Sequence, residues 1–439
     1  MAMPQWDYRS PMWANHRRPV KEDGVMMDCV IENAALVGRP GRWAIALQDG
    51  HIADVQPTMR APAQTIINAA GHLLIPGLVD GHIHLDKAFL LQQAPAQVGD
   101  FAEALATTLQ LKQQYTIEDI QERSRTVLER AIAFGITAMR SHVEVDPILG
   151  LKSMEALLPL KREYATGITL QLAVFAQEGI TNQPGTEKLL RQAMAMGGDV
   201  IGSAPYVDPD PQRNIAIIFD IAEEFDCDVD FHLDFLDNDD PLQLPLVVAE
   251  TQKRQWQGRV CLGHMTKLAG LSPEQLQAIA ADLQSAGISI LALPASDLYM
   301  MSRQDTYNVR RGVAPLHQLA DWGVTVGTAT NNIQNLFTPF GDGDVLKIAT
   351  LLANVLQLGT SAQHEFCLDL VTRQGAKAIG IDNYGVEPGC AADLVLLGVN
   401  SASAAIATAT PHRTVFKAGK LVAQTQLQSQ TFWEAVATG

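Results

Sequence analysis

The chain has few cysteines and, for an acidic protein, few basic residues. Its five cysteines are odd in number and scattered, with no C-x-x-C pair, which argues against a disulfide framework and suits a reducing compartment. Lysine and arginine number 32 against 48 aspartates and glutamates, a net charge of −16, so the clustered positive charge that binds nucleic acid is missing. The sequence has neither an apolar run long enough to span a bilayer nor the apolar core of a signal peptide. We therefore expect a cytoplasmic protein that binds neither nucleic acid nor membranes.

The composition indicates a large folded protein. Hydrophobic residues make up 47% of the chain and charged residues 18%, which is enough apolar material for a sizeable core. The 439 residues exceed a typical single domain and leave room for a large barrel and a smaller module. The acidic balance suits a soluble enzyme that acts on a small neutral or cationic molecule.

Short strand-like runs occur at both ends of the chain, separated by glycine and proline. Near the start they cover residues 27–31, 43–48, 51–55 and 63–68, and near the end 393–397, 413–416 and 420–423. Short strands with closely spaced turns predict a small β-module, and the two segments can pair into one sandwich. We therefore predict an N-terminal arm at 1–25, a β-sandwich domain from 26–76 and 385–425, and a barrel domain from 77–384.

The middle of the chain alternates short apolar strands with amphipathic helices. This pattern is typical of parallel β/α units, and stretches such as 117–134 and 187–196 have helical periodicity. We predict an α/β fold, a (β/α)8 TIM-type barrel, whose active site lies at the carboxyl ends of the strands; the number eight rests partly on the resemblance given below. The strand candidates are residues 73–82, 138–143, 169–175, 200–204, 229–233, 260–262, 288–293 and 324–327.

Four histidines stand at the ends of strand candidates. His82-Ile83-His84 follows an apolar strand and a Pro-Gly turn, and alternate residues of a strand face the same side, so the two imidazoles are neighbours. Neutral imidazole suits zinc, iron and related divalent metals. His232 and His264 each end a further candidate. Any one of them alone can be a packed or capping histidine, but together they would converge on one face of a barrel and form an open, catalytic type of metal site.

Several segments, in order along the chain, resemble the amidohydrolase superfamily. They are PGLVDGHIHLDKAF (76–89), RSHVEVDPILGLKSMEALLPLKREY (140–164), QLAVFAQEGI (171–180), FHLD (231–234), GHMTKL (263–268), PFGDGDVL (339–346) and GVEPGCAADLVLL (385–397). The similarity extends from about residue 27 to 425. Within the superfamily the chain is most similar to the cytosine deaminase-like branch, which also includes triazine-ring hydrolases of the N-isopropylammelide amidohydrolase type.

The resemblance implies a metal-dependent hydrolase of a non-peptide C–N bond. The substrate would be a small cyclic amidine or amide, such as a pyrimidine- or triazine-like ring, and the enzyme could form a homo-oligomer. His82, His84 and His232 would bind a divalent metal ion, which is zinc, iron or manganese. Such a metal lowers the pKa of bound water and supplies hydroxide near neutral pH.

The same resemblance implies further site residues. His264 would hydrogen-bond the attacking water or the substrate, and Gln177 of the Q-E-G-I motif would contact the amide edge of the ring. Lys87 matches a lysine of the triazine hydrolases, and Asn332 matches an asparagine often found beside the family's catalytic aspartate; we predict that both bind substrate. His142 matches a family histidine without a ligand role, and we interpret it as structural or as a support for the ligands.

Two positions depart from the family pattern. Phe235 stands where the family has a proton-carrying glutamate, and Asn331 where it has an aspartate that binds metal and deprotonates water. Neither side chain accepts a proton near pH 7, and losing a general acid or base costs about 10²–10⁴-fold in rate. Either Asp234 or Asp297 serves as the base, with Asn331 offering its carbonyl oxygen to the metal and Phe235 lining the substrate site, or the chain is a catalytically impaired homologue that retains ligand binding.

Overall fold

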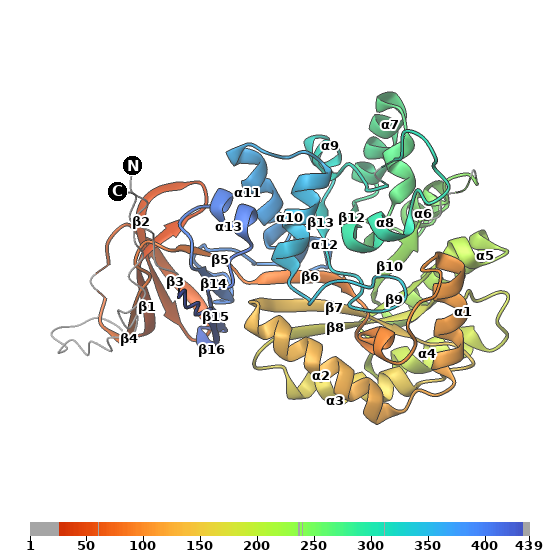
Figure 1. Cartoon of the computed structure of the whole chain (residues 1–439), viewed down its shortest axis with the longest axis horizontal. Coiled ribbons are helices and arrows are strands. Elements are labelled where there is room, and N and C mark those ends of the chain that lie inside the picture. Colours follow the sequence, from red (N-terminus) through yellow and green to blue (C-terminus); the bar gives the residue numbers. More distant parts are fainter. Residues whose placement is uncertain (1–25, 60, 236–237, 239, 311, 433–439) are drawn as a thin grey trace.

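The computed structural model describes residues 26–59, 61–235, 238, 240–310 and 312–432. The predicted arm at 1–25 lies outside the described residues. Within them the chain forms a barrel and a second sheet, which stand side by side in Figure 1. The first strands, drawn in red and orange, and the last, drawn in dark blue, lie together in the second sheet.

In the described chain, eight parallel strands form the barrel, each paired with the next in sequence. The barrel closes just beyond the last strand, where the backbone N–H of Asn331 donates to the carbonyl of His82 at 2.7 Å and the carbonyl of Asn331 accepts from His84 at 2.9 Å. The (β/α)8 prediction is therefore confirmed. The strands are β6 (Leu78–Ile83), β7 (Ile136–Glu144), β8 (Thr169–Ala176), β9 (Val200–Ser203), β10 (Asp228–Leu233), β11 (Val260–His264), β12 (Ile288–Ala292) and β13 (Val326–Thr328).

Helices surround the barrel strands, and several begin at a side-chain cap. Thr116 accepts a hydrogen bond from the third residue of α2, and Ser272 and Gln275 form a reciprocal capping box at α7. The helices are α1 (Phe101–Lys112), α2 (Ile117–Ala133), α3 (Lys152–Glu163), α4 (Thr186–Gly197), α5 (Pro211–Phe225), α6 (Leu244–Lys253), α7 (Pro273–Ser285), α8 (Pro294–Met300), α9 (Leu316–Asp321), α10 (Val345–Val355), α11 (Ser361–Asp369), α12 (Arg373–Ala378) and α13 (Ala402–Thr408). Short 3-10 turns are η1 (Leu85–Lys87), η2 (Leu90–Gln92), η3 (Pro205–Val207) and η4 (Thr266–Gly270).

Both ends of the chain build the second sheet. Its strands are β1 (Met27–Leu36), β2 (Arg39–Gln48), β3 (His51–Gln56), β4 (Ala63–Asn68), β5 (Leu73–Pro76), β14 (Leu394–Leu397), β15 (Arg413–Lys417) and β16 (Lys420–Thr425). β5 pairs with β1 on one side and with β14 on the other, which joins the two ends. β1 also pairs with β2 and β4, and the strands share a core of their own that contains Ile45, Leu394 and Phe416. The predicted β-sandwich from the chain ends is confirmed.

One predicted strand is in fact two. Residues 73–82 were expected to form a single barrel strand, but the chain leaves the second sheet after Pro76 and enters the barrel at Leu78. Gly77 makes the change of sheet possible, because a Cβ at this position would stand 1.9 Å from the hydroxyl of Thr137. Hydropathy does not show which sheet a strand joins. Residues 73–82 were therefore predicted to form one continuous strand.

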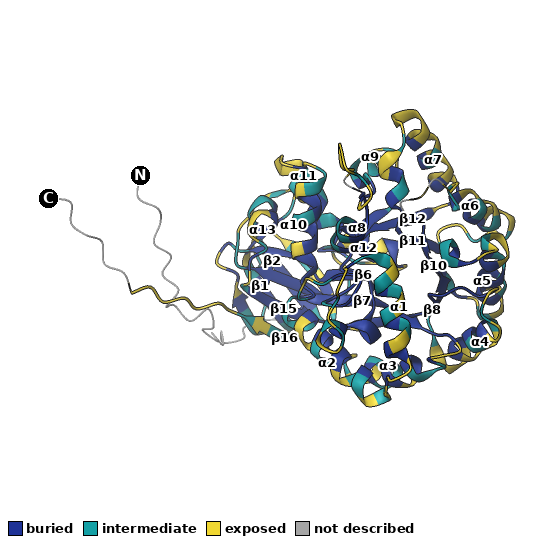
Figure 2. Cartoon of the chain, turned by 45° about the vertical axis from the view of Figure 1, so that its right-hand side comes forward, coloured by how far each residue is buried: buried dark blue, intermediate teal, exposed yellow. Residues whose placement is uncertain are grey.

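The barrel strands are buried on both faces, as Figure 2 shows by their dark blue colour. Every residue of β6 and β7 is buried, which is expected for a parallel sheet with helices outside and packed side chains inside. Exposed residues gather on the outer faces of the helices. In the described part of the chain, no helix is long and apolar enough to cross a membrane.

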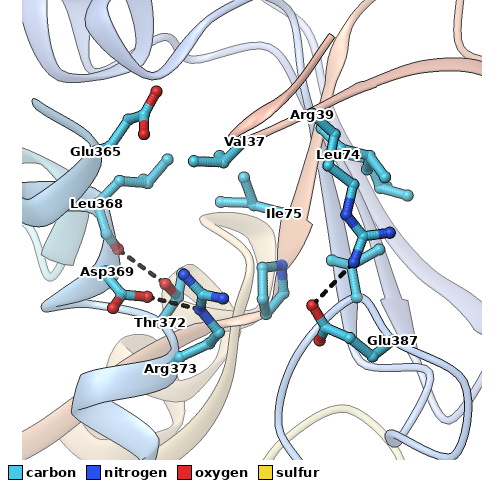
Figure 3. Close-up of a pocket in the computed structure, with 13 residues that line it drawn as sticks. Val37, Arg39, Leu74, Ile75, Glu365, Leu368, Asp369, Thr372, Arg373 and Glu387 are labelled. Atoms are coloured by element: carbon cyan, nitrogen blue, oxygen red, sulfur yellow. Dashed lines mark hydrogen bonds and ion pairs between the residues drawn. The ribbon is translucent and has the colours of Figure 1, made fainter. Parts of the chain in front are cut away.

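A cleft lies at the junction of the second sheet and the barrel helices (Figure 3). Its apolar walls come from β1, β5 and α11, and four of its charged groups form two ion pairs. Arg39 lies 3.3 Å from Glu387, and Arg373 lies 2.8 Å from Asp369. None of the predicted site residues lines this cleft. The cleft is therefore a seam between the two parts of the fold and is separate from the histidines.

Candidate active site

Three histidines from two strands meet at the carboxyl end of the barrel. His82 lies in β6, His84 directly follows β6, and His232 lies in β10. The Nε2 atoms of His82 and His84 each lie 3.0 Å from the Nε2 atom of His232. All three side chains are buried. The alternation of β6 turns His82 and His84 to the same side, as the sequence pattern indicates.

The protonation state and spacing of these imidazoles suit a metal ion. Burial, reinforced by nearby positive groups, holds the pKa of His82, His84 and His232 well below 6.5, so each ring is neutral and has a lone pair to donate. Tetrahedral ligands at about 2.0–2.1 Å from zinc lie roughly 3.3 Å from one another, close to the 3.0 Å between these nitrogen atoms. The three residues therefore fit as ligands of a divalent cation.

His142 of β7 packs against this cluster. Its ring centroid lies 3.9 Å from that of His82, and nitrogen atoms of His82, His142 and His232 form a group compact enough to hold a metal. His142 Nε2 lies 3.2 Å from one carboxylate oxygen of Asp230, whose other oxygen accepts from Arg140 at 2.8 Å. The buried Asp230 thus orients His142 beside His82, which agrees with a supporting role.

Asn331 brings an amide oxygen to the same place. Its backbone is held between His82 and His84 by the two hydrogen bonds that close the barrel, and its Nδ2 donates to Ser296 Oγ at 2.8 Å. Its Oδ1 is buried and has no hydrogen-bond partner among the described residues. A buried acceptor without a partner is costly, and a cation held by the histidines would provide one.

His264 is paired with a buried carboxylate. Its Nδ1 lies 2.7 Å from Asp297 Oδ1, and the other oxygen of Asp297 accepts from the backbone N–H of Leu293 at 2.9 Å. Burial raises the pKa of Asp297, and its hydrogen bond with His264 opposes that rise. The pair fixes the ring of His264 so that its Nε2 is free to face a ligand.

Two predicted site residues take part in loop structure. The carboxylate oxygens of Asp234 accept from the backbone N–H groups of Gln243 at 2.8 Å and Leu244 at 3.2 Å, where α6 begins. Asn332 accepts from the side chain of Asn335 at 2.6 Å. These bonds favour a structural role for the Asp234 carboxylate, while its proposed catalytic role stays a prediction.

The backbone is unusual where the barrel strands end. Asp234, His264, Met265 and Asn331 have φ values between 47° and 74°. Residues other than glycine rarely adopt this left-handed region, and such strain concentrates at functional sites. These four positions follow or end β10, β11 and β13, where the histidines converge.

Phe235 packs against the site, and its phenyl ring has no group that could carry a proton. Its ring centroid lies 4.2 Å from that of His264, and its side chain is buried. Phe101 of α1 lies 5.8 Å from it and Tyr206 of η3 lies 5.9 Å from it. An apolar wall thus occupies the position for which the family pattern has a glutamate.

Lys87 and Gln177 belong to a polar side of the site. Lys87 Nζ lies 3.4 Å from Gln177 Oε1 and forms an ion pair with Glu144. The second oxygen of Glu144 lies 2.6 Å from Lys112, the last residue of α1. Burial works against the charged form of Glu144, but the two ammonium groups outweigh it and lower the pKa of Glu144 to about 2. Lys87 is therefore held in place by a fully buried charge chain.

Lys112 also fills what would otherwise be a second cation site. Glu144, Asp146 and Glu178 form an acidic group of the size that holds a metal, but the ammonium of Lys112 lies 2.6, 2.9 and 2.6 Å from their oxygens. Burial raises the pKa of Glu178 to about 7 despite Lys112. The group is a buried ion cluster that joins α1 to the ends of β7 and β8.

The sequence did not identify Glu144, Lys112 or Phe101 as part of this region. Glu144 lies inside a segment that had been matched to the family, and its position at the end of a buried strand was the only available signal. Lys112 and Phe101 lie on a helix whose surroundings depend on tertiary packing. No local pattern predicts such contacts.

Known proteins of similar sequence belong to the family that the motifs resemble. The sequence model of the amidohydrolase family matches residues 65–423. N-isopropylammelide isopropyl amidohydrolase from Pseudomonas sp. (strain ADP) is 28% identical over 414 residues, which cover 91% of this chain and 98% of that protein. Pterin deaminase from Rhizobium rhizogenes is 27% identical over 384 residues, which cover 86% and 87%.

Solved structures agree with the sequence matches. The crystal structure of 5-methylcytosine deaminase from Klebsiella pneumoniae, liganded with 5-fluorocytosine, has a TM-score of 0.86 and 28% identity, and the match covers 92% of this chain and 99% of that one. The resemblance inferred from the motifs is therefore confirmed.

Proposed function

Because the chain belongs to the amidohydrolase family, we propose that it hydrolyses a non-peptide C–N bond in a small cyclic amidine or amide with a pyrimidine- or triazine-like ring. The observation that carries this proposal is the convergence of three imidazoles beside the oxygen of Asn331 that has no partner among the described residues: the Nε2 atoms of His82 and His84 each lie 3.0 Å from that of His232. The relatives are named for reactions on triazine, pterin and cytosine rings, and these names support the proposed substrate class.

His82, His84 and His232 would hold a divalent metal, with Asn331 Oδ1 as an additional neutral ligand. Zinc suits an imidazole-rich site best, and iron and manganese are the alternatives. When bound, the metal would act as a Lewis acid and activate a water molecule for attack on the ring carbon. Since Asn331 carries no charge, the site would bind the cation less tightly than one with a carboxylate ligand.

The remaining residues would bind the ring and move protons. His264, oriented by Asp297, faces the histidine cluster and would hydrogen-bond the attacking water and pass its proton to the leaving nitrogen. Lys87 and Gln177 would bind the oxygen and amide edge of the ring, and Phe235 would line the opposite side of the substrate. Asn332 is a further proposed substrate contact. Asp234 is a proposed base, but both of its carboxylate oxygens already accept hydrogen bonds from backbone N–H groups.

Metal analysis combined with turnover tests the proposal. Protein purified without chelators is expected to contain close to one equivalent of zinc, iron or manganese, and His82→Ala to lose it. Cytosine, isocytosine, ammelide and N-isopropylammelide are the ring substrates to test, with His51→Ala as the control because His51 is an exposed residue of β3. Absence of metal in the wild-type protein would rule out the hydrolase.

A second candidate is a ligand-binding homologue without hydrolytic activity. It is favoured by the apolar side chain of Phe235, which packs beside His264 at the position where a glutamate was expected from the family pattern. Such a protein would bind both metal and ring but turn over none of the rings above. The double variant Phe235→Glu with Asn331→Asp should then gain deamination, whereas an unchanged lack of turnover would count against an inherited deaminase site.

A further inference from the structure

Six side chains form a closed ring of contacts beside the histidine cluster. They come from the connections after β6, β8, β9, β10 and β13, so each is positioned by the carboxyl end of the barrel. In order around the ring they are Phe235, Phe101, Phe337, Lys87, Gln177 and Tyr206.

One half of this ring is aromatic. The centroid of Phe101 lies 5.8 Å from that of Phe235 and 6.0 Å from that of Phe337, in edge-to-face geometry. Phe235 in turn lies 4.2 Å from His264 and 5.9 Å from Tyr206. Phe235 and Phe337 are buried, and Phe101 is half-buried at the first turn of α1. The three phenyl rings offer no hydrogen-bonding group to a ligand.

The opposite half is polar. The ammonium of Lys87 lies 5.1 Å from the ring centroid of Phe337 and 3.4 Å from Gln177 Oε1, and the side chain of Gln177 is hydrogen-bonded to Tyr206. The ion pairs of Glu144 with Lys87 and Lys112 hold this ammonium in place. The ring of side chains therefore presents a cation on one side and hydrocarbon on the other.

We propose that Phe101, Phe235 and Phe337 are specificity-determining residues that bind a hydrocarbon substituent of the substrate, while Lys87 and Gln177 bind a carbonyl or anionic oxygen at its opposite edge. This inference rests on the proposed ring hydrolase and names its substrate class: an oxo-substituted ring that carries an alkyl group. A polar group placed against the phenyl wall would lose its hydrogen bonds to water and find no replacement. An alkyl group there would instead be removed from water.

The expected preference for the alkylated ring can be estimated from the behaviour of apolar pockets in other enzymes. One missing methylene in such a pocket is worth about 10–200-fold in kcat/KM. We therefore expect the wild-type protein to favour the alkylated member of a matched pair of rings by about 10–100-fold. Suitable pairs are cytosine with 5-methylcytosine and ammelide with N-isopropylammelide.

The experiment measures kcat/KM for both members of each pair with the metal-loaded protein, and their Kd by calorimetry. Phe101→Gln should remove most of the alkyl preference by raising KM for the alkylated ring alone, while Phe101→Leu, which stays apolar, should retain it. Phe101 is the residue to change first because it is only half-buried. Lys87→Met should weaken the binding of both members of a pair equally and leave the ratio of their kcat/KM values unchanged.

The outcomes separate this inference from the proposed function. Equal kcat/KM, or equal Kd where no turnover occurs, for both members of every pair in the wild-type protein overturns the aromatic wall but leaves the hydrolase proposal standing. A preserved ratio in a folded Phe101→Gln variant overturns the role of Phe101. A protein that holds no metal and binds none of the rings removes the proposed function and this inference with it.

Discussion

Asn331 is the residue whose lack of charge should weaken cation binding at the proposed metal site. Its side-chain oxygen is buried without a partner among the described residues, while its Nδ2 is bound to Ser296. A carboxylate of the same size would keep the bond to Ser296, which would then donate its hydroxyl proton. It would also add a negative charge next to three neutral imidazoles.

We predict that Asn331→Asp binds zinc at least about tenfold more tightly, since a charged ligand interacts far more strongly than a neutral one at low effective dielectric constant. Competition with a chromogenic chelator measures the change. Asn354→Asp, on the exposed face of α10, is the matched control and should leave the affinity unchanged. An affinity that stays constant in both variants would show that residue 331 does not reach the cation.

Single residues also mark how far sequence reasoning extends. His82, His84, His232 and His264 could be predicted because each ends a strand, and a barrel brings strand ends together. Asp297 was predicted only as one of two candidate bases and not as the partner of His264, since it lies 33 positions away and its contact depends on the turn into α8. Contacts of this kind are properties of packing and leave no local pattern.

Neighbouring strands constrain the metal ligands through close backbone approach. Gly263 in β11 faces the imidazole of His82, and a Cβ at this position would stand 2.6 Å from His82 Cε1 and 2.8 Å from its Nδ1. The ring therefore occupies the space that a side chain on β11 would need.

Gly263→Ala should displace the ring of His82 and reduce bound metal at least about tenfold, because structural support of a ligand is worth 10–100-fold in metal affinity. Metal content per folded protein, with circular dichroism as the check on folding, measures this. Gly270→Ala is the control, since nothing lies within 4 Å of a Cβ at that position. Full metal content in Gly263→Ala would mean that β11 does not hold His82 in place.

The ion cluster at the end of α1 should make stability depend on pH. Burial raises the pKa of Glu178 to about 7, against an ordinary value of 4.5, so the folded protein binds this proton more tightly than the unfolded chain. The contribution of Glu178 is fully present below pH 4.5 and is lost as the pH rises to about 7.

Glu178→Gln should remove on the order of 1–3 kcal/mol of pH dependence between pH 5 and 8. Urea unfolding at both pH values measures it, and Glu365→Gln on the exposed surface of α11 is the control. An unchanged difference in unfolding free energy between the two pH values would show that Glu178 is ionised throughout.

Elements were predicted better than their boundaries. Short apolar runs predicted β1 to β4 and the eight barrel strands, with the number eight guided partly by the family resemblance, but the run at 73–82 hid a change of sheet at Gly77. The eighth strand was expected at 324–327 and lies at Val326–Thr328, because the backbone N–H of Val324 donates to the carbonyl of Leu319 in α9. Where a strand ends depends on its neighbours in the sheet, which hydropathy does not report.

At the scale of the whole molecule, one buried ion pair joins the terminal sheet to the barrel. Arg413 of β15 donates to both carboxylate oxygens of Asp344, at 2.8 and 2.7 Å, and to the carbonyl of Phe134 at 2.6 Å. Asp344 caps the start of α10, and Phe134 follows α2. The sequence predicted that the chain ends would pair, but not which residue would tie them to the barrel.

Arg413→Met should lower the free energy of unfolding by about 3–5 kcal/mol, because it leaves the buried carboxylate of Asp344 without its partner. Adding Asp344→Leu should recover part of that loss, since removing both buried charges is far less costly than removing one. Arg39→Met is the matched control: its pair with Glu387 is 33% and 45% exposed and is worth about 0–1 kcal/mol. Urea unfolding followed by tryptophan fluorescence and far-ultraviolet circular dichroism measures all three. If Arg413→Met costs no more than Arg39→Met, the buried pair of Arg413 with Asp344 does not help to hold the terminal sheet on the barrel.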